Sequence, residues 1–256
     1  MKKLQAGKRH FYQFDQFPEE GLLNFCSSKS GWGGDGNCRF TGDSPTIFAD
    51  YRSELAESLG LQEKQFVFPR QTHSNNVAVV REATTEADIP DTDALITDVP
   101  GLCICVQTAD CVPVLLYDPK QRVVAAIHAG WRGTVGKIVA KTVEMMQDQF
   151  QSKAENLLAG IGPSISAPNY EVSEDVIQQV KNEFSNHEAL LTASGNNGKA
   201  YLDLWHANKS LLLEMGVPSQ QIEVMGFCSF GEKDEFYSAR REGAETGRMV
   251  CGIILF

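Results

Sequence analysis

Apolar residues in the middle of the chain fall into short β-rich runs separated by turn residues. Six strands are predicted there, over residues 65–68, 77–81, 94–97, 102–107, 112–117 and 123–128. The last of these runs is nearly continuous in its apolar character. Three further strands are predicted over residues 157–161, 222–227 and 250–256.

Helix signals mark four other segments. A helix is predicted from Pro45 to about residue 59, with Ser44 as its N-cap and Gly60 after its end. The others are predicted over 137–150, 173–184 and 202–215. Polar residues predict loops over 27–44 and 192–199, and a glycine-rich turn is predicted over 130–136.

Helices and strands are interleaved along the chain, so we expect an α/β to α+β fold with mixed β-sheets flanked by helices. A length of 256 residues fits one large domain or at most two small ones. Hydrophobic residues make up 42% and charged residues 22%, so the chain can fill a core and disorder is excluded for most of it.

Charge and hydropathy narrow the class of partner. The net charge of −10, without a basic stripe, argues against general binding to nucleic acid or to an anionic membrane. No apolar run approaches the ~20 residues of a membrane span, and no export signal is found. We therefore expect a cytoplasmic protein. Its seven cysteines are then expected to be thiols or metal ligands rather than disulfides.

Three segments carry candidate chemistry, and in each a metal-ligating side chain lies near the end of a predicted strand. They contain His73, Cys111 and His128. One thiolate and two imidazoles fit Zn²⁺, and three protein ligands leave a fourth position open for catalysis. Asp110, beside Cys111, is a candidate to orient a ligand or to act as a base. The spacing matches no common zinc motif, so structural histidines and a buried thiol are the alternative.

The motifs around these residues closely resemble those of the laccase-domain family. They are Arg70-Gln-Thr-His-Ser, Asp93-Ala-Leu-Ile-Thr, Thr108-Ala-Asp-Cys-Val-Pro and His128-Ala-Gly-Trp-Arg-Gly. The resemblance continues in Ile161-Gly-Pro-Ser-Ile, Tyr170-Glu-Val, Leu202-Asp-Leu, Phe236-Tyr-Ser-Ala-Arg-Arg-Glu-Gly and Gly247-Arg248, and it covers the chain from about residue 20 to its end.

This resemblance implies a single catalytic domain over residues 1–256, with layered mixed sheets similar to a toxin-type Cys/His hydrolase domain. It implies that His73, Cys111 and His128 bind zinc. It also implies phosphorolysis of adenosine, inosine and 5′-methylthioadenosine, together with hydrolytic deamination of adenosine. The expected partners are therefore purine nucleosides and phosphate, and both a monomer and a homodimer fit.

Phosphate needs a pocket of its own, and two segments are candidates. A strand followed by a glycine-rich turn and a helix predicts an anion site with Arg132 and Gly133, although the same glycines could serve only close packing. Arg240 with Ser238 is the second candidate. If that segment is extended, adjacent arginines point to opposite faces and one of them faces the pocket; a solvated pair is the alternative, and the resemblance favours Arg240.

Other functions use the same residues. Cys111 activated by His128 would make a Cys–His hydrolase for a cell-wall precursor or an amide. A copper polyphenol oxidase is a weaker hypothesis, because the chain lacks the set of histidines that several coppers need. A zinc-stabilised binding module without activity is the last alternative, and the open coordination position argues against it.

Overall fold

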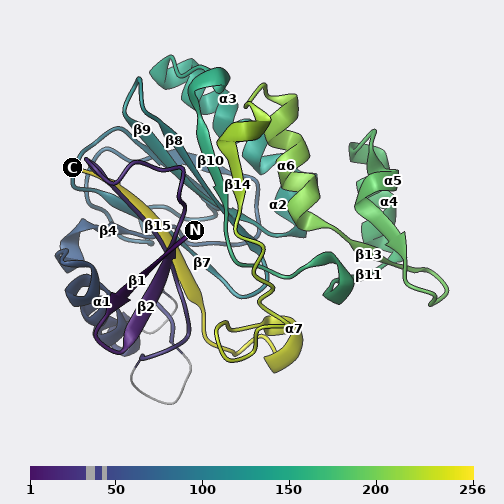
Figure 1. Cartoon of the computed structure of the whole chain (residues 1–256), viewed down its shortest axis with the longest axis horizontal. Helices are drawn as coiled ribbons and strands as arrows, with labels where there is room; N and C mark the ends of the chain where they lie inside the picture. The colour runs from purple at the N-terminus through teal and green to yellow at the C-terminus, as the bar shows by residue number, and fades with distance from the viewer. Residues whose placement is uncertain (33–37, 42–44) are drawn as a thin grey trace.

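The computed structural model describes residues 1–32, 38–41 and 45–256, with the side chains of 45–47 excepted. Within this part of the chain, two large mixed sheets pack face to face and helices cover their outer sides (Figure 1). The predicted fold class, with mixed sheets flanked by helices, is confirmed. No helix in the described ranges is long and apolar enough to cross a membrane.

The first sheet has six strands in the order β1-β2-β3-β15-β7-β4. All its pairs are antiparallel except β4 with β7. The strands are β1 (Lys2–Ala6), β2 (Arg9–Gln13), β3 (Leu22–Ser27), β15 (Met249–Leu255), β7 (Cys103–Thr108) and β4 (Phe66–Val67).

The second sheet also has six strands, in the order β14-β10-β8-β9-β6-β5. The two pairs at its ends, β10 with β14 and β5 with β6, are parallel, and the inner pairs are antiparallel. The strands are β14 (Ile222–Val224), β10 (Leu158–Ile161), β8 (Val112–Asp118), β9 (Val123–Ala129), β6 (Ala94–Thr97) and β5 (Val77–Val79).

Alternation along β7 and β8 shows how the layers form. Ile104 and Leu115 face the layer between the two sheets, whereas Cys105 faces outward toward α1 and Val114 faces outward toward α3. Both faces of these central strands are buried, which is why their sequences are continuous apolar runs. Cys105 is fully buried, as expected for a thiol packed in a core.

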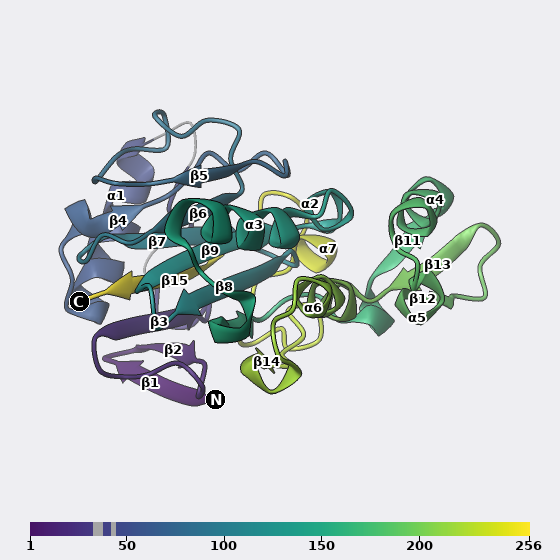
Figure 2. The ribbon, with the colours of Figure 1, turned by 90° about the horizontal axis from the view of Figure 1, so that it is seen from above.

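The helices divide between the two outer faces. α1 covers the first sheet, while α3 and α6 cover the second, and the short α2 follows β9 (Figure 2). The helices are α1 (Pro45–Leu59), α2 (Trp131–Val135), α3 (Ile138–Phe150), α6 (Leu204–Glu214) and α7 (Ala239–Glu242). Single 3₁₀ turns lie at η1 (Glu63–Gln65), η2 (Ala154–Asn156), η3 (Ala167–Asn169) and η4 (Ser219–Gln221).

A small third sheet, of order β11-β13-β12, lies with α4 and α5 at one end of the molecule (Figures 1 and 2). Its elements are β11 (Glu171–Ser173), α4 (Glu174–Glu183), α5 (His187–Leu190), β12 (Leu191–Ala193) and β13 (Lys199–Leu202). This unit borders α2, because its helix α4 contacts α2.

Three sequence predictions need correction. The predicted turn over 130–136 is helix α2, held by hydrogen bonds such as Gly136 N to Arg132 O at 2.8 Å. The predicted loop over 192–199 is shorter, because its two ends pair as β12 and β13. The predicted helix over 202–215 starts at Leu204, since Leu202 pairs in β13 and Asp203 caps the helix. The N-cap prediction for Ser44 lies outside the described residues.

Candidate metal and catalytic site

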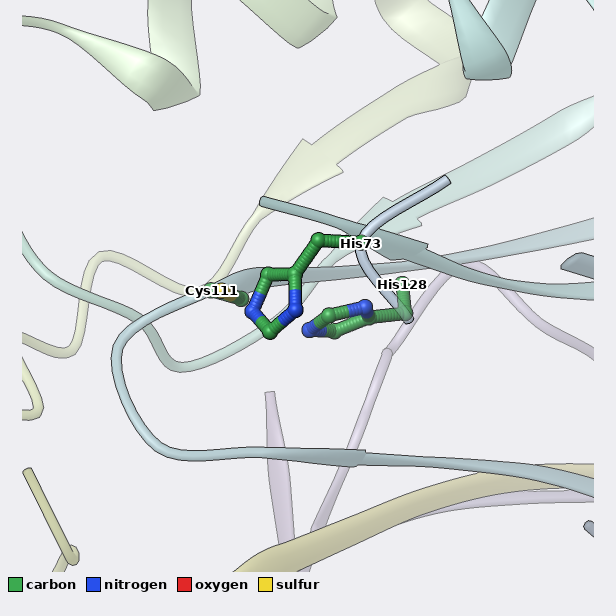
Figure 3. A group of neighbouring side chains, drawn as sticks. All are labelled: His73, Cys111 and His128. Atoms are coloured by element: carbon green, nitrogen blue, oxygen red, sulfur yellow. The ribbon is translucent and has the colours of Figure 1, made fainter. Parts of the chain in front are cut away.

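His73, Cys111 and His128 meet at one end of the second sheet (Figure 3). His73 lies in the loop before β5, Cys111 directly precedes β8, and His128 is the second-last residue of β9. The ligand atoms of all three lie within 4.8 Å of one another. In the residues that the structure describes, this is the one group of three or more such side chains close enough to share a metal ion.

The register of the sheet explains this convergence. β8 and β9 are antiparallel, with Val112 opposite Ala129, so the start of β8 and the end of β9 lie at the same end of the sheet. Cys111 therefore lies close to His128, although 16 residues separate them in the sequence. Their closeness is a consequence of strand pairing rather than of a short sequence motif.

Gly130 leaves the space that the cluster of His73, Cys111 and His128 occupies. A Cβ atom at this position would lie 2.9 Å from Sγ of Cys111 and 3.1 Å from Cδ2 of His73. Both contacts are too short for any residue other than glycine without displacement of the cluster. The glycine after His128 is therefore required by the close approach of the other two side chains.

Asp93 is hydrogen-bonded both to His128 and to the loop that carries His73. It is fully buried at the start of β6, and its Oδ1 accepts a hydrogen bond from Nδ1 of His128 at 2.7 Å. The same carboxylate accepts the backbone N–H groups of Thr72, His73 and Ser74 and the hydroxyl of Ser74. One side chain thus fixes both the ring of His128 and the loop that carries His73. Nε2 of His128 is left to face the cluster.

No role was predicted for Asp93, although its segment was among the motifs that resemble the laccase-domain family. A usable signal was present, because an aspartate directly precedes a strand whose four residues are all buried. A buried carboxylate needs partners. The sequence alone did not show that those partners would be His128 and the loop over 72–74.

Two residues of the site have backbone angles that favour glycine. His73 has φ of 62° and Asp110 has φ of 91°. A non-glycine residue in this region costs of order 1 kcal/mol or more and persists where surrounding contacts hold it. For His73 the hydrogen bond from its N–H to Asp93 is one such contact, at 3.1 Å.

The electrostatics of the cluster favour a thiolate beside an imidazolium. Burial raises the pKa of the Cys111 thiol, but the charge of His128 and hydrogen bonds from both histidines outweigh it and lower the pKa to about 6. Burial lowers the pKa of His128, but Cys111 and Asp93 raise it to about 9. For Asp93, burial acts to raise the pKa, yet bonds from His128 and Ser74 hold it at about 2.

Asp110 contacts α7 rather than the cluster. Its Oδ1 accepts the Ser229 hydroxyl at 2.7 Å and its Oδ2 accepts the backbone N–H of Arg240 at 2.7 Å. Ser238 is the N-cap of the same helix, and its hydroxyl accepts the N–H of Arg241. The carboxylate that orients His128 is therefore that of Asp93, and Asp110 and Ser238 position α7.

The segment that contains Arg240 and Arg241 is helical, not extended, so the argument from opposite strand faces does not apply. Arg241 donates to three backbone carbonyls, those of Ser229, Phe230 and Phe236, at 2.6–2.7 Å. Arg240 is exposed, with its guanidinium 5.0 Å from the ring centroid of Tyr170. Of the two arginines, Arg240 is the one available to a ligand.

The glycines around α2 serve close packing. A Cβ on Gly133 would lie 3.1 Å from the carbonyl oxygen of Ser74, and one on Gly136 would lie 2.6 Å from Nδ2 of Asn75. The loop of His73 thus rests against α2. Arg132 is exposed and its guanidinium stacks 4.4 Å from the ring centroid of Trp131.

A hollow of about 490 Å³ lies between α2 and α4. None of His73, Cys111 and His128 lines it. Arg132 and Lys137 line it together with the carboxylates of Asp175 and Glu183. Charges of both signs therefore share this surface, which makes it a weak anion site.

Comparison with known proteins places the chain in a family. Residues 28–256 match the family described as multi-copper polyphenol oxidoreductase laccase. The chain belongs to this laccase family. A purine nucleoside phosphorylase of Bacteroides thetaiotaomicron is 38% identical over 247 residues, covering 91% of this chain and 92% of the relative. The protein named adenosine deaminase RL5, from an unknown prokaryotic organism, is 40% identical, covering 84% and 85%.

Solved structures of the laccase family agree with this fold. The hypothetical protein YfiH of Bacillus licheniformis superimposes with a TM-score of 0.89 at 30% identity, covering 98% of this chain and 97% of that one. The resemblance to the laccase-domain family is confirmed. The names of the curated relatives support an enzyme.

Proposed function

We propose that this protein is a zinc-dependent purine nucleoside phosphorylase that also deaminates adenosine, with His73, Cys111 and His128 as its metal ligands. The observation that carries the proposal is the convergence of these three donors within 4.8 Å. The names of the relatives supply the substrate class. Adenosine, inosine and 5′-methylthioadenosine are the proposed nucleosides.

The donor set fits zinc. Zinc–nitrogen and zinc–sulfur bonds of about 2.0–2.3 Å place tetrahedral ligand atoms roughly 3.3–3.8 Å apart, so small side-chain movements would close the cluster on an ion. The chain has five histidines, too few for several copper centres of the laccase type. One thiolate and two imidazoles also bind a single copper in electron-transfer proteins, so metal content is part of the test.

Bound zinc would act as a Lewis acid and lower the pKa of a bound water molecule. The chain's own residues prepare the site for it. Asp93 holds one proton of His128 on Nδ1, so Nε2 is the nitrogen that would ligate the metal after releasing its own proton. Trp131 and Tyr170 are partly buried aromatic rings beside Arg132 and Arg240. We propose that these flat surfaces bind the purine, since aromatic rings stack on planar bases.

A second candidate is a Cys–His hydrolase, and one observation favours it. Asp93, His128 and Cys111 form an acid–imidazole–thiol relay, the arrangement in which a histidine activates a nucleophile. His73 has no role in such a relay, whereas a zinc site uses it as the third ligand. The third donor is therefore what separates the two functions structurally.

The test combines metal analysis with turnover. We expect about one zinc per chain and phosphate-dependent release of purine base from the three nucleosides, with products separated by chromatography. In a chelator titration, zinc loss, activity loss and rising reactivity of Cys111 toward iodoacetamide should run together. Full activity in zinc-free protein, abolished by iodoacetamide, would refute the zinc requirement and favour Cys111 as a nucleophile, the chemistry of the second candidate.

A further inference from the structure

Two arginines that are far apart in the sequence lie side by side near the cluster. Arg39 donates to the carbonyls of Ala244 and Thr246 at 3.2 and 3.4 Å. Arg248 donates to the same two carbonyls, at 2.8 Å for Ala244, and to that of Gly247 at 3.0 Å. Because they share acceptors, the two guanidinium groups are neighbours.

This pair of cations is poorly neutralised. Among the residues that the structure describes, Arg39 has one carboxylate partner, Glu245 at 3.2 Å, whose side chain is 93% exposed. An exposed pair of this kind contributes little. Arg248 is half-buried and forms no ion pair within 4.0 Å with any residue that the structure describes. Burial and the charge of Arg39 both lower the pKa of Arg248, as expected for cations held together.

The pair lies on the side of the cluster that faces the first sheet. Arg248 directly precedes β15, whose first residue, Met249, is paired with Thr108 at the end of β7. Only Ala109 and Asp110 then separate Thr108 from Cys111. Both Cys111 and Asp110 are close enough to raise the pKa of Arg248 by their charge. A ligand bound to the arginines would therefore be near the proposed metal.

We propose that Arg39 and Arg248 form the binding site for the inorganic phosphate that cleaves the nucleoside. This rests on the proposed function of the site. Guanidinium groups bind phosphate through paired charge-assisted hydrogen bonds. In the reaction, a phosphate oxygen forms a bond to C1′ of the ribose as the C1′–N9 bond breaks. The bonding electrons go to the purine, which takes up the proton lost by hydrogen phosphate, and ribose 1-phosphate remains.

The other arginines of the site fit this role less well. Arg132 shares its hollow with Asp175 and Glu183. The guanidinium of Arg240 donates to the carbonyl of Glu171 at 3.0 Å and covers Tyr170, and its backbone N–H already binds Asp110. These arginines lie beside aromatic rings, in positions that fit the nucleoside better than a second anion.

The experiment measures two reactions of one protein. Arg39→Met and Arg248→Met should each raise the KM for phosphate in inosine phosphorolysis by about 10- to 100-fold, the loss expected for charge-assisted hydrogen bonds. Adenosine deamination in phosphate-free buffer should stay within about twofold, because water then attacks C6 of the purine and phosphate takes no part in the reaction. The lysine variants of both positions should be intermediate.

Controls separate this from other causes. Arg122→Met removes an exposed arginine that donates to Phe256 O at the opposite edge, and should change neither reaction. Arg132→Met and Arg240→Met should raise the KM for nucleoside more than that for phosphate. If Arg248→Met does not fold, because it loses three carbonyl contacts, then Arg39→Met and Arg248→Lys decide.

An unchanged KM for phosphate in both methionine variants, or a parallel loss of deamination, would overturn the inference. Absence of both reactions from the wild-type protein would instead refute the proposed function. In that case the arginine pair is tested by inorganic phosphate alone. Phosphate should raise the thermal midpoint of the wild type but not of Arg39→Met, and no rise in the wild type would refute the phosphate site as well.

Discussion

Replacement of Asp93 by asparagine tests the central structural claim about the site. The carboxylate is fully buried and accepts five hydrogen bonds, two at Oδ1 and three at Oδ2. Asparagine has nearly the same shape but only one oxygen. If that oxygen takes the three donors at Oδ2, its NH₂ group faces the N–H of His73 and Nδ1 of His128.

The size of the effect follows from these contacts. Hydrogen bonding lowers the pKa of Asp93 from 3.8 to about 2 despite its burial, which corresponds to about 2.5 kcal/mol. Removal of one partner from a buried charged pair costs about 3–5 kcal/mol. A loss of about 3 kcal/mol in a chain of this size lowers the thermal midpoint by roughly 6–12 °C.

The effect on zinc is separate from the effect on stability. The amide of the asparagine variant would oblige His128 to accept at Nδ1 and so to carry its proton on Nε2, the nitrogen that faces the metal. We expect the Asp93→Asn substitution to weaken zinc affinity by about 10- to 100-fold, the usual effect of losing such an orienting partner. Competition with a chromogenic chelator measures the affinity, and thermal unfolding of the chelated protein measures the stability.

Asp91→Asn is the matched control. Asp91 lies two positions away and bonds the same loop through Asn76, at 3.0 Å, but its contacts are exposed. The Asp91→Asn substitution should lower the thermal midpoint by less than about 2 °C and leave zinc affinity within about twofold. The reasoning would be wrong if folded Asp93→Asn protein retained the zinc affinity and activity of the wild type.

Three other perturbations test the rest of the site. Gly130→Ala should strain the cluster by about 1–3 kcal/mol and reduce zinc affinity and turnover, while Gly231→Ala, whose added Cβ would lie at ordinary distances of 3.6–4.0 Å, should change neither; equal zinc affinity in the two variants would contradict the close approach. Cys111→Ala should lose both zinc and activity, and Cys111→Asp or Cys111→His should recover part of each, because zinc accepts oxygen and nitrogen donors; recovery of zinc without any activity would favour a nucleophilic thiol. All seven cysteines are free in the structure, so thiol titration under denaturing, non-reducing conditions should find seven thiols after metal removal, and a persistent shortfall would reveal a disulfide.

The choice between a metal ligand and a nucleophile for Cys111 illustrates what geometry adds to a motif. The sequence placed a thiol and two histidines near strand ends, which left both chemistries open. The structure shows that His73 lies within reach of the other two donors, and it adds Asp93 as the fixed partner of His128. The thiol–imidazole pair remains common to both mechanisms, and the third donor is what metal binding uses.

The sequence by itself determined three of the strands that are buried on both faces, whereas β3, which is also largely buried, was not predicted. β6, β8 and β9 were predicted within one residue of their observed ends, because a strand buried on both faces must be apolar at every position. The same continuity made their polar ends conspicuous, and Cys111 and His128 were found there. The local sequence pattern can predict a strand where burial on both faces admits mainly apolar residues.

Only the tertiary structure decided which distant residues meet. Asp93 reaches His128 because β6 pairs with β9, and Arg248 comes near Cys111 because β15 pairs with β7. The small third sheet escaped prediction because Thr192 and Ala193 are exposed and lack an apolar pattern. These features depend on strand order and register, and contacts between residues far apart in the sequence leave no periodic signal in the segments that form them.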